Sequence, residues 1–496
     1  MRRALAGLAL LAAPAGCGTG EPTASPPPAV ARPLTAVAAS PSPRAWPQFG
    51  IDAARTNSTS AATQITAASA GKLRRHTIGL PGTVDSSPIF LPRVRVHGRA
   101  HDVIVVTTSY GRTLALDAVS GKRLWQFVPP GIRGWERSTQ ITNAAPAADP
   151  DHRSVYAAAP DGKVHKISLE NGREVRAGAW PVAITRLPSR EKITSALSVF
   201  DGYVLATTGG YVGDADPYQG HVVTIARSTG RIHAVFNSLC SDRRFLQRPS
   251  TCTKRGLGLA SDSAIWGRAG AVVDRAKREV YVATGNGPFD GRRFWGDSML
   301  VLSFPDLRLR RNWTPYNQQQ LTDTDLDLGS VDPVLLPGGL VLQGGKDARM
   351  DVLSRARPNG RTTRPSPRLG GQKQTLKLPG GGQVLTSGAP AVSGDLVFVA
   401  TDNGTAAYRV RGGRLRQVWA NGAAGTSPVL AGGLLYVYDA GGRLNVYRPT
   451  TGARVASLAA GEGHWNSPIV VGGRVWLPEG SANDHVTSGR LAVYSR

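Results

Sequence analysis

The sequence predicts an all-β fold, an eight-bladed β-propeller with four-stranded antiparallel blades and a ring closed by an N-terminal strand. Three observations lead to this prediction. Glycine (59) and proline (35) together supply 94 of the 496 residues, against a usual share of about 12%, so turns are frequent and long helices are disfavoured. A strand-rich pattern opens eight times along the chain. One strand-like run is left over before the first repeat, and one strand is missing from the last.

The repeated unit consists of four short runs of β-branched or alternating residues, separated by polar or glycine-containing turns. In the first copy these runs lie at 84–90, 102–108, 112–118 and 123–127. Such a succession is typical of a four-stranded antiparallel meander. The openings recur every 38 to 74 residues, so the longer units carry loop insertions. The eight openings lie around Pro88, Pro146, Leu197, Ala271, Pro333, Pro390, Pro428 and Pro468.

The two ends of the repeat region predict how the ring closes. The eighth unit, 466–496, leaves no room for a fourth strand, whereas the run at 72–78 has no partner in the first unit. An N-terminal strand that completes the last blade removes an exposed sheet edge. Length alone suggests about three domains at roughly 150 residues each. The matched strands instead favour a single propeller over residues 46–496.

The N-terminal region predicts export. Two arginines precede an apolar run of about ten residues at 4–13, which is too short for a permanent membrane helix and typical of a signal peptide. Ala15, Gly16 and Cys17 resemble a bacterial lipobox, although Pro14 stands where leucine is usual. We therefore expect a lipoprotein-type signal peptide at 1–16, lipidation of Cys17, and a disordered Pro/Ala/Ser-rich tether at 17–45. An ordinary signal peptide with an incidental cysteine is the alternative. Either way the protein lies outside the cytoplasm, lipid-anchored to the bacterial cell membrane or secreted.

The chain has only three cysteines, which excludes a disulfide-rich scaffold, a cysteine-held iron–sulfur cluster and a CxxCH haem site. Cys240 and Cys252 flank a polar, arginine-rich loop. In an oxidising compartment this arrangement predicts a disulfide. Metal binding is the weaker interpretation, because no histidine lies nearby.

Positive charge is the chain's strongest compositional bias: 59 Lys and Arg face 34 Asp and Glu, a net charge of +25. The basic residues are scattered and come at most in adjacent pairs, so we do not expect nucleic-acid binding. A basic surface suits work beside anionic envelope polymers. The expected partners are an envelope protein or polymer, or a small alcohol substrate, and the membrane is reached through the lipid anchor only. We expect a monomer.

The end of the first unit carries a more specific pattern, ALDAVSGKRLW at 115–125. Gly121 suits a turn position with positive φ, and Trp125 can pack between neighbouring blades. Weaker echoes occur at 170–172, 228–230 and 449–452. The pattern resembles the repeat of the pyrroloquinoline quinone (PQQ) propeller superfamily over about residues 46–496. Two branches of that superfamily are the quinoprotein alcohol dehydrogenases and the barrel-assembly scaffold lipoproteins.

The fourth and fifth units resemble the dehydrogenase branch most. The stretch from Trp266 to the YVATGNG run at 281–287 implies that Trp266 is the floor beneath a quinone and Asn286 a Ca²⁺ ligand. A planar anionic cofactor stacks on an indole, and an amide oxygen suits a hard cation. The alternatives are a packing role for Trp266 between blades and a turn role for Asn286.

Two further roles follow from the same resemblance. Asp323 falls at the place of the catalytic base, where it would also lie beside the metal, and Asp325 is the alternative base. Lys346 matches the cation over the quinone carbonyls. A solvated acidic turn and an ordinary surface lysine are the alternatives.

Two departures from the dehydrogenases stand against catalysis. The chain has no adjacent cysteine pair, and Tyr211 occupies the place of a metal-binding glutamate, with Asp214 and Asp216 nearby. No GxSxG, HExxH or Walker A motif indicates another enzyme class. The first hypothesis is therefore a binding or scaffold propeller. The alternative is a PQQ-dependent alcohol dehydrogenase with a modified quinone and Ca²⁺ site.

Overall fold

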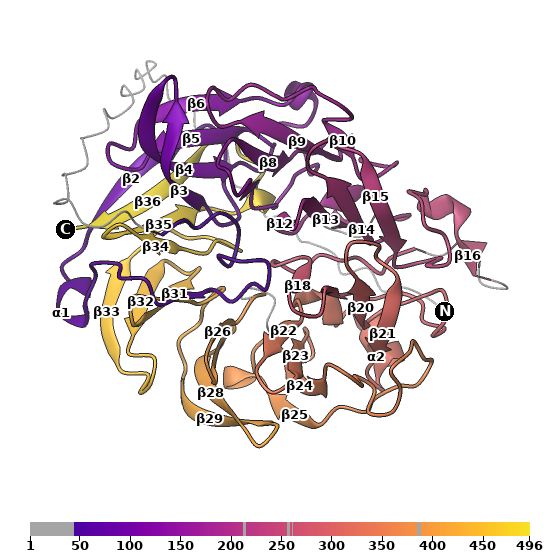
Figure 1. The fold of residues 1–496 in the computed structure, drawn as a ribbon. Coiled ribbons are helices and arrows are strands. Elements are labelled where there is room, and N and C mark those ends of the chain that lie inside the picture. Colours follow the sequence, from indigo (N-terminus) through magenta and orange to yellow (C-terminus); the bar gives the residue numbers. More distant parts are fainter. Residues whose placement is uncertain (1–43, 212–214, 255–257, 260, 384–387) are drawn as a thin grey trace, which may run out of the picture. The chain divides into compact units, whose positions relative to one another are not determined.

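The computed structural model describes residues 44–211, 215–254, 258–259, 261–383 and 388–496. Strands of this part form eight antiparallel blades that follow one another around a ring (Figure 1), and a separate two-stranded sheet of β16 (Thr253–Lys254) and β17 (Gly258–Leu259). Within the described ranges, no helix has the length and apolar character needed to cross a bilayer. The predicted fold class, an eight-bladed propeller with four-stranded blades, is confirmed.

Blades 1 to 4 occupy the first part of the ring, and each runs in chain order from its innermost to its outermost strand. Blade 3 carries an additional strand, β11 (Glu191–Ile193), which pairs with β13. The strands of these blades are β3 (Ile89–Val96), β4 (Arg99–Thr107), β5 (Thr113–Asp117) and β6 (Arg123–Phe127); β7 (Ala147–Ala148), β8 (Ser154–Ala158), β9 (Lys163–Ser168) and β10 (Val182–Ala183); β12 (Ser198–Phe200), β13 (Tyr203–Gly210), β14 (His221–Ala226) and β15 (Ile232–Asn237); and β18 (Val272–Asp274), β19 (Glu279–Ala283), β20 (Met299–Ser303) and β21 (Leu309–Trp313).

Blades 5 to 8 complete the ring. Their strands are β22 (Val334–Leu336), β23 (Leu340–Gly344), β24 (Arg349–Ser354) and β25 (Gln374–Lys377); β26 (Ala391–Ser393), β27 (Leu396–Ala400), β28 (Thr405–Arg411) and β29 (Arg414–Asn421); β30 (Val429–Ala431), β31 (Leu434–Asp439), β32 (Arg443–Tyr447) and β33 (Arg454–Ala459); and β34 (Ile469–Val471), β35 (Arg474–Glu479) and β36 (Gly489–Ser495), joined by β2 (Arg74–Leu80). Each predicted opening precedes or enters the first strand of a blade.

Ring closure occurs as predicted, by a strand from the N-terminal side. β2 pairs antiparallel with β36, from Arg74 opposite Ser495 to Leu80 opposite Gly489. The strand begins two residues later than the predicted run. This pairing supplies the fourth strand of blade 8, so the first and last parts of the chain share one sheet and its exposed edge is removed.

Tryptophans at the ends of blades lock neighbouring blades together. The indole of Trp125 in blade 1 donates to the carbonyl of Leu169 in blade 2 at 2.8 Å. A Cβ on Gly172 would lie 2.9 Å from that indole, so the site requires glycine. Trp419 of blade 6 repeats the arrangement with Gly452 of blade 7. The predicted packing of Trp125 between blades is confirmed, and the glycines echoed along the chain receive the tryptophan of the preceding blade.

The disulfide between Cys240 and Cys252 is present, and both residues are fully buried. They pack with Leu239 and Phe294 in a small apolar cluster beside blades 3 and 4. This pairing was predicted from the sequence.

The segment 44–63 runs around the inner strands of the ring, visible as the indigo trace among them (Figure 1). Its short strand β1 (Ser58–Thr59) pairs in parallel with β30 of blade 7. Hydrogen bonds join the segment in turn to blades 1, 2, 3, 4, 6, 7 and 8, through Trp46 and Phe90, Pro47 and Ala148, Gln48 and Val199, Ala53 and Val273, Thr56 and Val392, Asn57 and Leu430, and Thr63 and Gly473.

The buried side chain of Arg55 fastens this segment to the ring. It donates to the carbonyl oxygens of Phe49 at 2.7 Å, Ala196 at 3.2 Å and Leu197 at 3.0 Å. Burial lowers the pKa of Arg55 to about 10, so the guanidinium remains charged at neutral pH.

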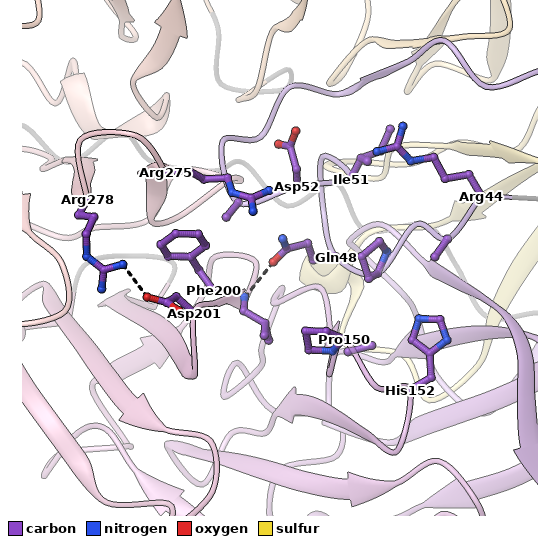
Figure 2. Close-up of a pocket in the computed structure, with 15 residues that line it drawn as sticks. Arg44, Gln48, Ile51, Asp52, Pro150, His152, Phe200, Asp201, Arg275 and Arg278 are labelled. Carbon is purple, nitrogen blue, oxygen red and sulfur yellow. Dashed lines mark hydrogen bonds and ion pairs between the residues drawn. The ribbon is translucent and has the colours of Figure 1, made fainter.

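The first strands of the eight blades surround the centre of the ring, which we call the channel. The channel has two different ends. In every blade the first two strands are antiparallel, so the turns between them gather at one end. We call this end the covered mouth, because the segment 44–63 runs beside it. A cavity of about 630 Å³ lies there. Its lining residues include Asp52, Asp201, Arg275 and Arg278, which Figure 2 labels. Residues that precede first strands or follow second strands gather at the opposite end.

Candidate functional site

A cavity of about 270 Å³ lies at that opposite end, which we call the tryptophan mouth. Residues just before a first strand or just after a second strand form its wall, as the antiparallel geometry requires. They come from blades 3, 4, 5 and 8 and are Lys192, Thr194, Gly210, Tyr211, Tyr218, Ala264, Trp266, Asn286, Asp327, Lys346, His464, Trp465 and Asn483.

Three residues that the sequence analysis grouped lie in this wall: Trp266, Asn286 and Lys346. Trp266 precedes β18, Asn286 follows β19, and Lys346 follows β23. The Lys346 ammonium lies 5.3 Å from the centre of the Trp266 ring. The fold therefore brings together an indole, an amide and a cation from two neighbouring blades.

The two acids proposed as the base lie elsewhere. Asp323 is the last residue of helix α2 (Gln318–Asp323), is exposed, and accepts a hydrogen bond from Gln319 at 2.8 Å. Asp325 has a side chain that is 63% exposed, and it meets Lys346 only from outside the cavity, at 3.3 Å. Neither lines the cavity. Helix α2 holds Asp323 at its exposed end, and the chain enters the mouth two residues after Asp325.

Asp327 is the carboxylate that reaches the cavity. One of its oxygens lies 2.5 Å from the Lys346 ammonium, and the other accepts the backbone N–H of Asn286 at 2.8 Å. Burial lowers the pKa of Lys346, but Asp327 and Asp325 raise it by more, so the lysine stays charged. The pair is an ion pair in the wall of the cavity.

A second carboxyl, Asp297, lies fully buried behind Asp327. It accepts hydrogen bonds from the backbone of Leu328 at 3.0 Å and from the Thr322 hydroxyl at 2.8 Å. Burial raises its pKa to about 8, more than these hydrogen bonds lower it. Asp297 is therefore mostly protonated at pH 7, beside Asp327, whose pKa burial raises more than Lys346 lowers it.

Blade 8 contributes a second indole that the sequence analysis missed. Trp465 lies 5.6 Å from Trp266, with the rings inclined at 35°, and His464 stacks on it at 4.4 Å. Two more cations face the Trp465 ring, Arg268 at 5.4 Å and Lys192 at 5.9 Å. The position of Trp465 in the sequence could have identified it, because Trp465 directly precedes the opening run of the eighth unit just as Trp266 precedes that of the fourth.

Buried Asp85 holds this wall in place. It accepts hydrogen bonds from the Asn143 amide at 2.9 Å, from the His464 ring at 2.8 Å and from the backbone of Trp465 at 2.8 Å. Burial would raise the pKa of Asp85, but His464 and Arg268 hold it below its usual range. Asn143 in turn accepts from Lys192 at 3.0 Å. An ionised carboxylate thus links blades 1, 2 and 8 and orients one of the cations.

The residues present do not fit a Ca²⁺ ion, which takes six to eight oxygen ligands. Asp327 is the one carboxylate in the described wall of the cavity, and Lys346 already engages it. Tyr211 stands at the expected glutamate's place and donates to the carbonyl of Pro188 at 2.9 Å. Asp216 is exposed, and Asp214 lies outside the described residues. The described part of the chain holds no cluster of three His, Cys, Asp or Glu suited to a metal.

A planar anionic ring fits the same wall better. Two indoles offer aromatic faces, and Lys192 and Lys346, which line the cavity, and Arg268, which is buried and does not line it, place positive charge against those faces. Pockets that bind small molecules commonly combine apolar walls with a few convergent polar groups. The donor set at the tryptophan mouth therefore suits an organic anion rather than a divalent cation.

The comparisons with known proteins agree with this architecture. The chain matches the family described as outer membrane protein assembly factor BamB over residues 92–233 and 279–457. No curated protein sequence matches it. Among solved structures it is similar to the quinohemoprotein alcohol dehydrogenase from Comamonas testosteroni, with 16% identity, a TM-score of 0.66, and coverage of 91% of this chain and 80% of that chain.

Two further structures show the same fold. A europium-containing methanol dehydrogenase has 16% identity and a TM-score of 0.65, with 91% of this chain and 98% of that chain covered. BamB from Moraxella catarrhalis has 12% identity and a TM-score of 0.51, with 86% and 100% covered. At these identities the likeness concerns the fold alone. Because the matched segments make up more than half of its length, this chain belongs to the PQQ-like propeller family described as outer membrane protein assembly factor BamB.

Proposed function

We propose that this protein is an extracytoplasmic binding or scaffold propeller whose tryptophan mouth holds a planar anionic ring compound without a metal ion. The observation that carries the proposal is the pair of indoles, Trp266 and Trp465, 5.6 Å apart with three cations against their faces. Aromatic rings stack on indoles, and anionic substituents pair with ammonium and guanidinium groups. PQQ is a compound of this class and serves as the probe.

The pairing of Asp327 and the protonation of Asp297 favour a binding function over a catalytic one. A general base must be free to accept a proton, whereas Asp327 is held by Lys346 at 2.5 Å and Asp297 is protonated at neutral pH. The donor set also lacks the oxygens that Ca²⁺ requires. The macromolecular partner of the propeller would be an envelope protein or polymer.

A PQQ-dependent alcohol dehydrogenase is the second candidate. It is supported by the convergence of Trp266, Asn286, Asp327 and Lys346 in one cavity. This candidate requires Ca²⁺ as well as PQQ, and small alcohols as substrates. The metal requirement separates the two candidates experimentally.

The decisive experiment is a titration of the protein with PQQ, followed by tryptophan fluorescence, once with EDTA and once with Ca²⁺. We expect quenching of equal affinity in both. Trp266→Ala should weaken the affinity about tenfold, because stacking on one aromatic side chain is worth roughly 1–3 kcal/mol by alanine substitution. Trp135→Ala is the matched control, since Trp135 does not line the cavity.

Other outcomes would replace the proposal. A strict Ca²⁺ requirement, together with alcohol-dependent reduction of an artificial electron acceptor, would establish the dehydrogenase. Absence of both quenching and thermal stabilisation at saturating PQQ would show that the mouth does not take this class of compound.

The location of the protein is tested separately. We propose that Cys17 is acylated after cleavage behind Gly16, because small residues precede it and a short apolar run lies before them. Mass spectrometry of the membrane fraction should find a diacylglyceryl group on Cys17, and Cys17→Ala should release the protein from membranes. A free N-terminus at another residue would contradict the anchor.

A further inference from the structure

The tip of the β28–β29 hairpin in blade 6 carries four exposed arginines. In the register of this hairpin Arg409 lies opposite Arg416, and Arg411 lies opposite Arg414. Residues two apart on a strand share a face, so all four side chains project from the same face. A two-residue turn of glycines with φ of 58° and 73° joins the strands and holds this register. We call these four residues the arginine ladder.

The ladder opposes the stability of its own sheet, since like charges directly opposite each other are destabilising. Asp395 pairs with Arg409 at 3.3 Å. Arg411, Arg414 and Arg416 have no ion-pair partner in the part of the chain that the structure describes. Within the described residues, Asp395 is therefore the one counter-charge paired with the four arginines.

Packing prevents the hairpin from relieving this repulsion by turning over. Leu415 is buried on the opposite face of the hairpin, in a cluster with Tyr408, and Val410 packs against it. A shift of register by one residue would expose these apolar side chains and bury arginines. The ladder is therefore a fixed array of positive charge directed to solvent.

The spacing of the array indicates the shape of its partner. Opposed side chains start about 5 Å apart across the strands, and successive pairs lie roughly 7 Å apart along them. Guanidinium groups bind phosphate through paired hydrogen bonds. Two successive pairs form a straight track for anions, which suits an extended chain better than a flat surface.

We propose that the arginine ladder is a docking site for a linear phosphodiester polymer of the cell envelope. The site is separate from the tryptophan mouth, whose wall comes from blades 3, 4, 5 and 8. It does not depend on what the cavity binds. The two arginines of each opposed pair would bind the same phosphate. The negative charge of the bound polymer would then remove the repulsion between them.

The experiment uses the whole protein and poly(glycerol phosphate) as the probe. The variant Arg411→Gln, Arg414→Gln, Arg416→Gln is compared with the control Arg99→Gln, Arg173→Gln, Arg231→Gln, which removes the same charge from exposed arginines of blades 1, 2 and 3. We expect the ladder variant to lose at least about tenfold in affinity. Its salt dependence, as the slope of log K against log salt, should fall by about 2, at roughly 0.7 for each lost contact. The control should change little.

Thermal unfolding at low salt supplies a second measurement. The ladder variant should melt at the same temperature as the wild type or higher, and the polymer should stabilise the wild type more than the variant. Equal loss of affinity in the control would overturn the proposal, because binding would then follow net charge. Ladder-dependent binding to phosphatidylglycerol vesicles or to single-stranded oligonucleotides, without binding to poly(glycerol phosphate), would also overturn it. A lower melting temperature of the ladder variant would do the same, because the four arginines would then stabilise the sheet.

Discussion

The two mouths of the channel differ in how their polar groups are satisfied. At the covered mouth, the segment 44–63 gives its backbone groups to the inner strands, and the ion pair of Arg278 with Asp201 is about half exposed on both sides. At the tryptophan mouth, charges are buried: Asp85 and Asp297 are inaccessible, and Asp327 is nearly so. The covered mouth has the larger cavity, about 630 Å³ against 270 Å³. Desolvated and perturbed groups, rather than cavity size, mark the candidate site.

The largest effect is expected at Arg55, the buried cation of the segment 44–63, which lines neither cavity. Arg55→Ala should destabilise the protein by roughly 3–5 kcal/mol, because it leaves three buried carbonyls without their donor and the buried Asp332 with only Arg268 as a nearby cation. Denaturant unfolding of the variant measures this. Arg44→Ala, in the same segment, is the control. A loss below about 1 kcal/mol for Arg55→Ala would show that the segment is not held as the structure indicates.

The second effect belongs to the tryptophan mouth and depends on pH. The pKa of Asp297, about 8 in the fold, lies above its unfolded value of about 3.9, so the folded state binds a proton that the unfolded state releases between these values. Stability from this group is therefore present at low pH and lost as the pH rises through 8. Between pH 6 and 9 the wild type should lose roughly 3 kcal/mol more than Asp297→Asn. Unfolding midpoints at both pH values test this, and parallel curves for the two proteins would contradict it.

The ion pair in the cavity wall should show a smaller, coupled effect. Lys346→Gln leaves the largely buried Asp327 without its cation, and Asp327→Asn leaves Lys346 with only the exposed Asp325. The double variant should be more stable than the sum of the single changes predicts, by about 1–3 kcal/mol. A double-mutant cycle measures this coupling. Lys346→Gln with Asp323→Asn is the control cycle, because Asp323 is exposed and bonds Gln319, whereas Lys346 pairs with Asp325 and Asp327.

The smallest effect is expected for the exposed pair at the covered mouth. Arg278→Gln breaks an ion pair of 2.6 Å to Asp201 whose side chains are 49% and 53% exposed. Exposed pairs contribute roughly 0–1 kcal/mol, and salt screens them. The change in stability should stay within that range and vanish at high salt. A loss as large as that of Arg55→Ala would remove the contrast between the two mouths.

Sequence patterns predicted the fold well because the propeller repeats a local unit. Short β-branched runs and turn residues specify each blade, and the missing strand of the last unit identified β2 as its partner. The glycine echo at Gly172 and Gly452 marked where indoles lie between blades. The disulfide followed from two cysteines beside one loop.

The candidate site was predicted only in part. Trp266, Asn286 and Lys346 meet in one cavity because neighbouring blades place equivalent positions at the same mouth. The acid expected there, Asp323, lies outside the cavity, since alignment along the chain could not show that helix α2 leaves Asp323 in solvent while Asp327 lies in the wall.

By itself, the sequence determined the number of blades, the closure of the ring and the positions at which side chains face a mouth. These depend on strand period and turn chemistry, which are local. Only the tertiary structure decided which indole faces Trp266, because Trp465 stands almost two hundred positions further along the chain. It also decided which acids are charged. Burial raises the pKa of Asp297 to about 8, and it raises the pKa of Asp327 more than Lys346 lowers it. These effects exist only once the ring has closed around both acids.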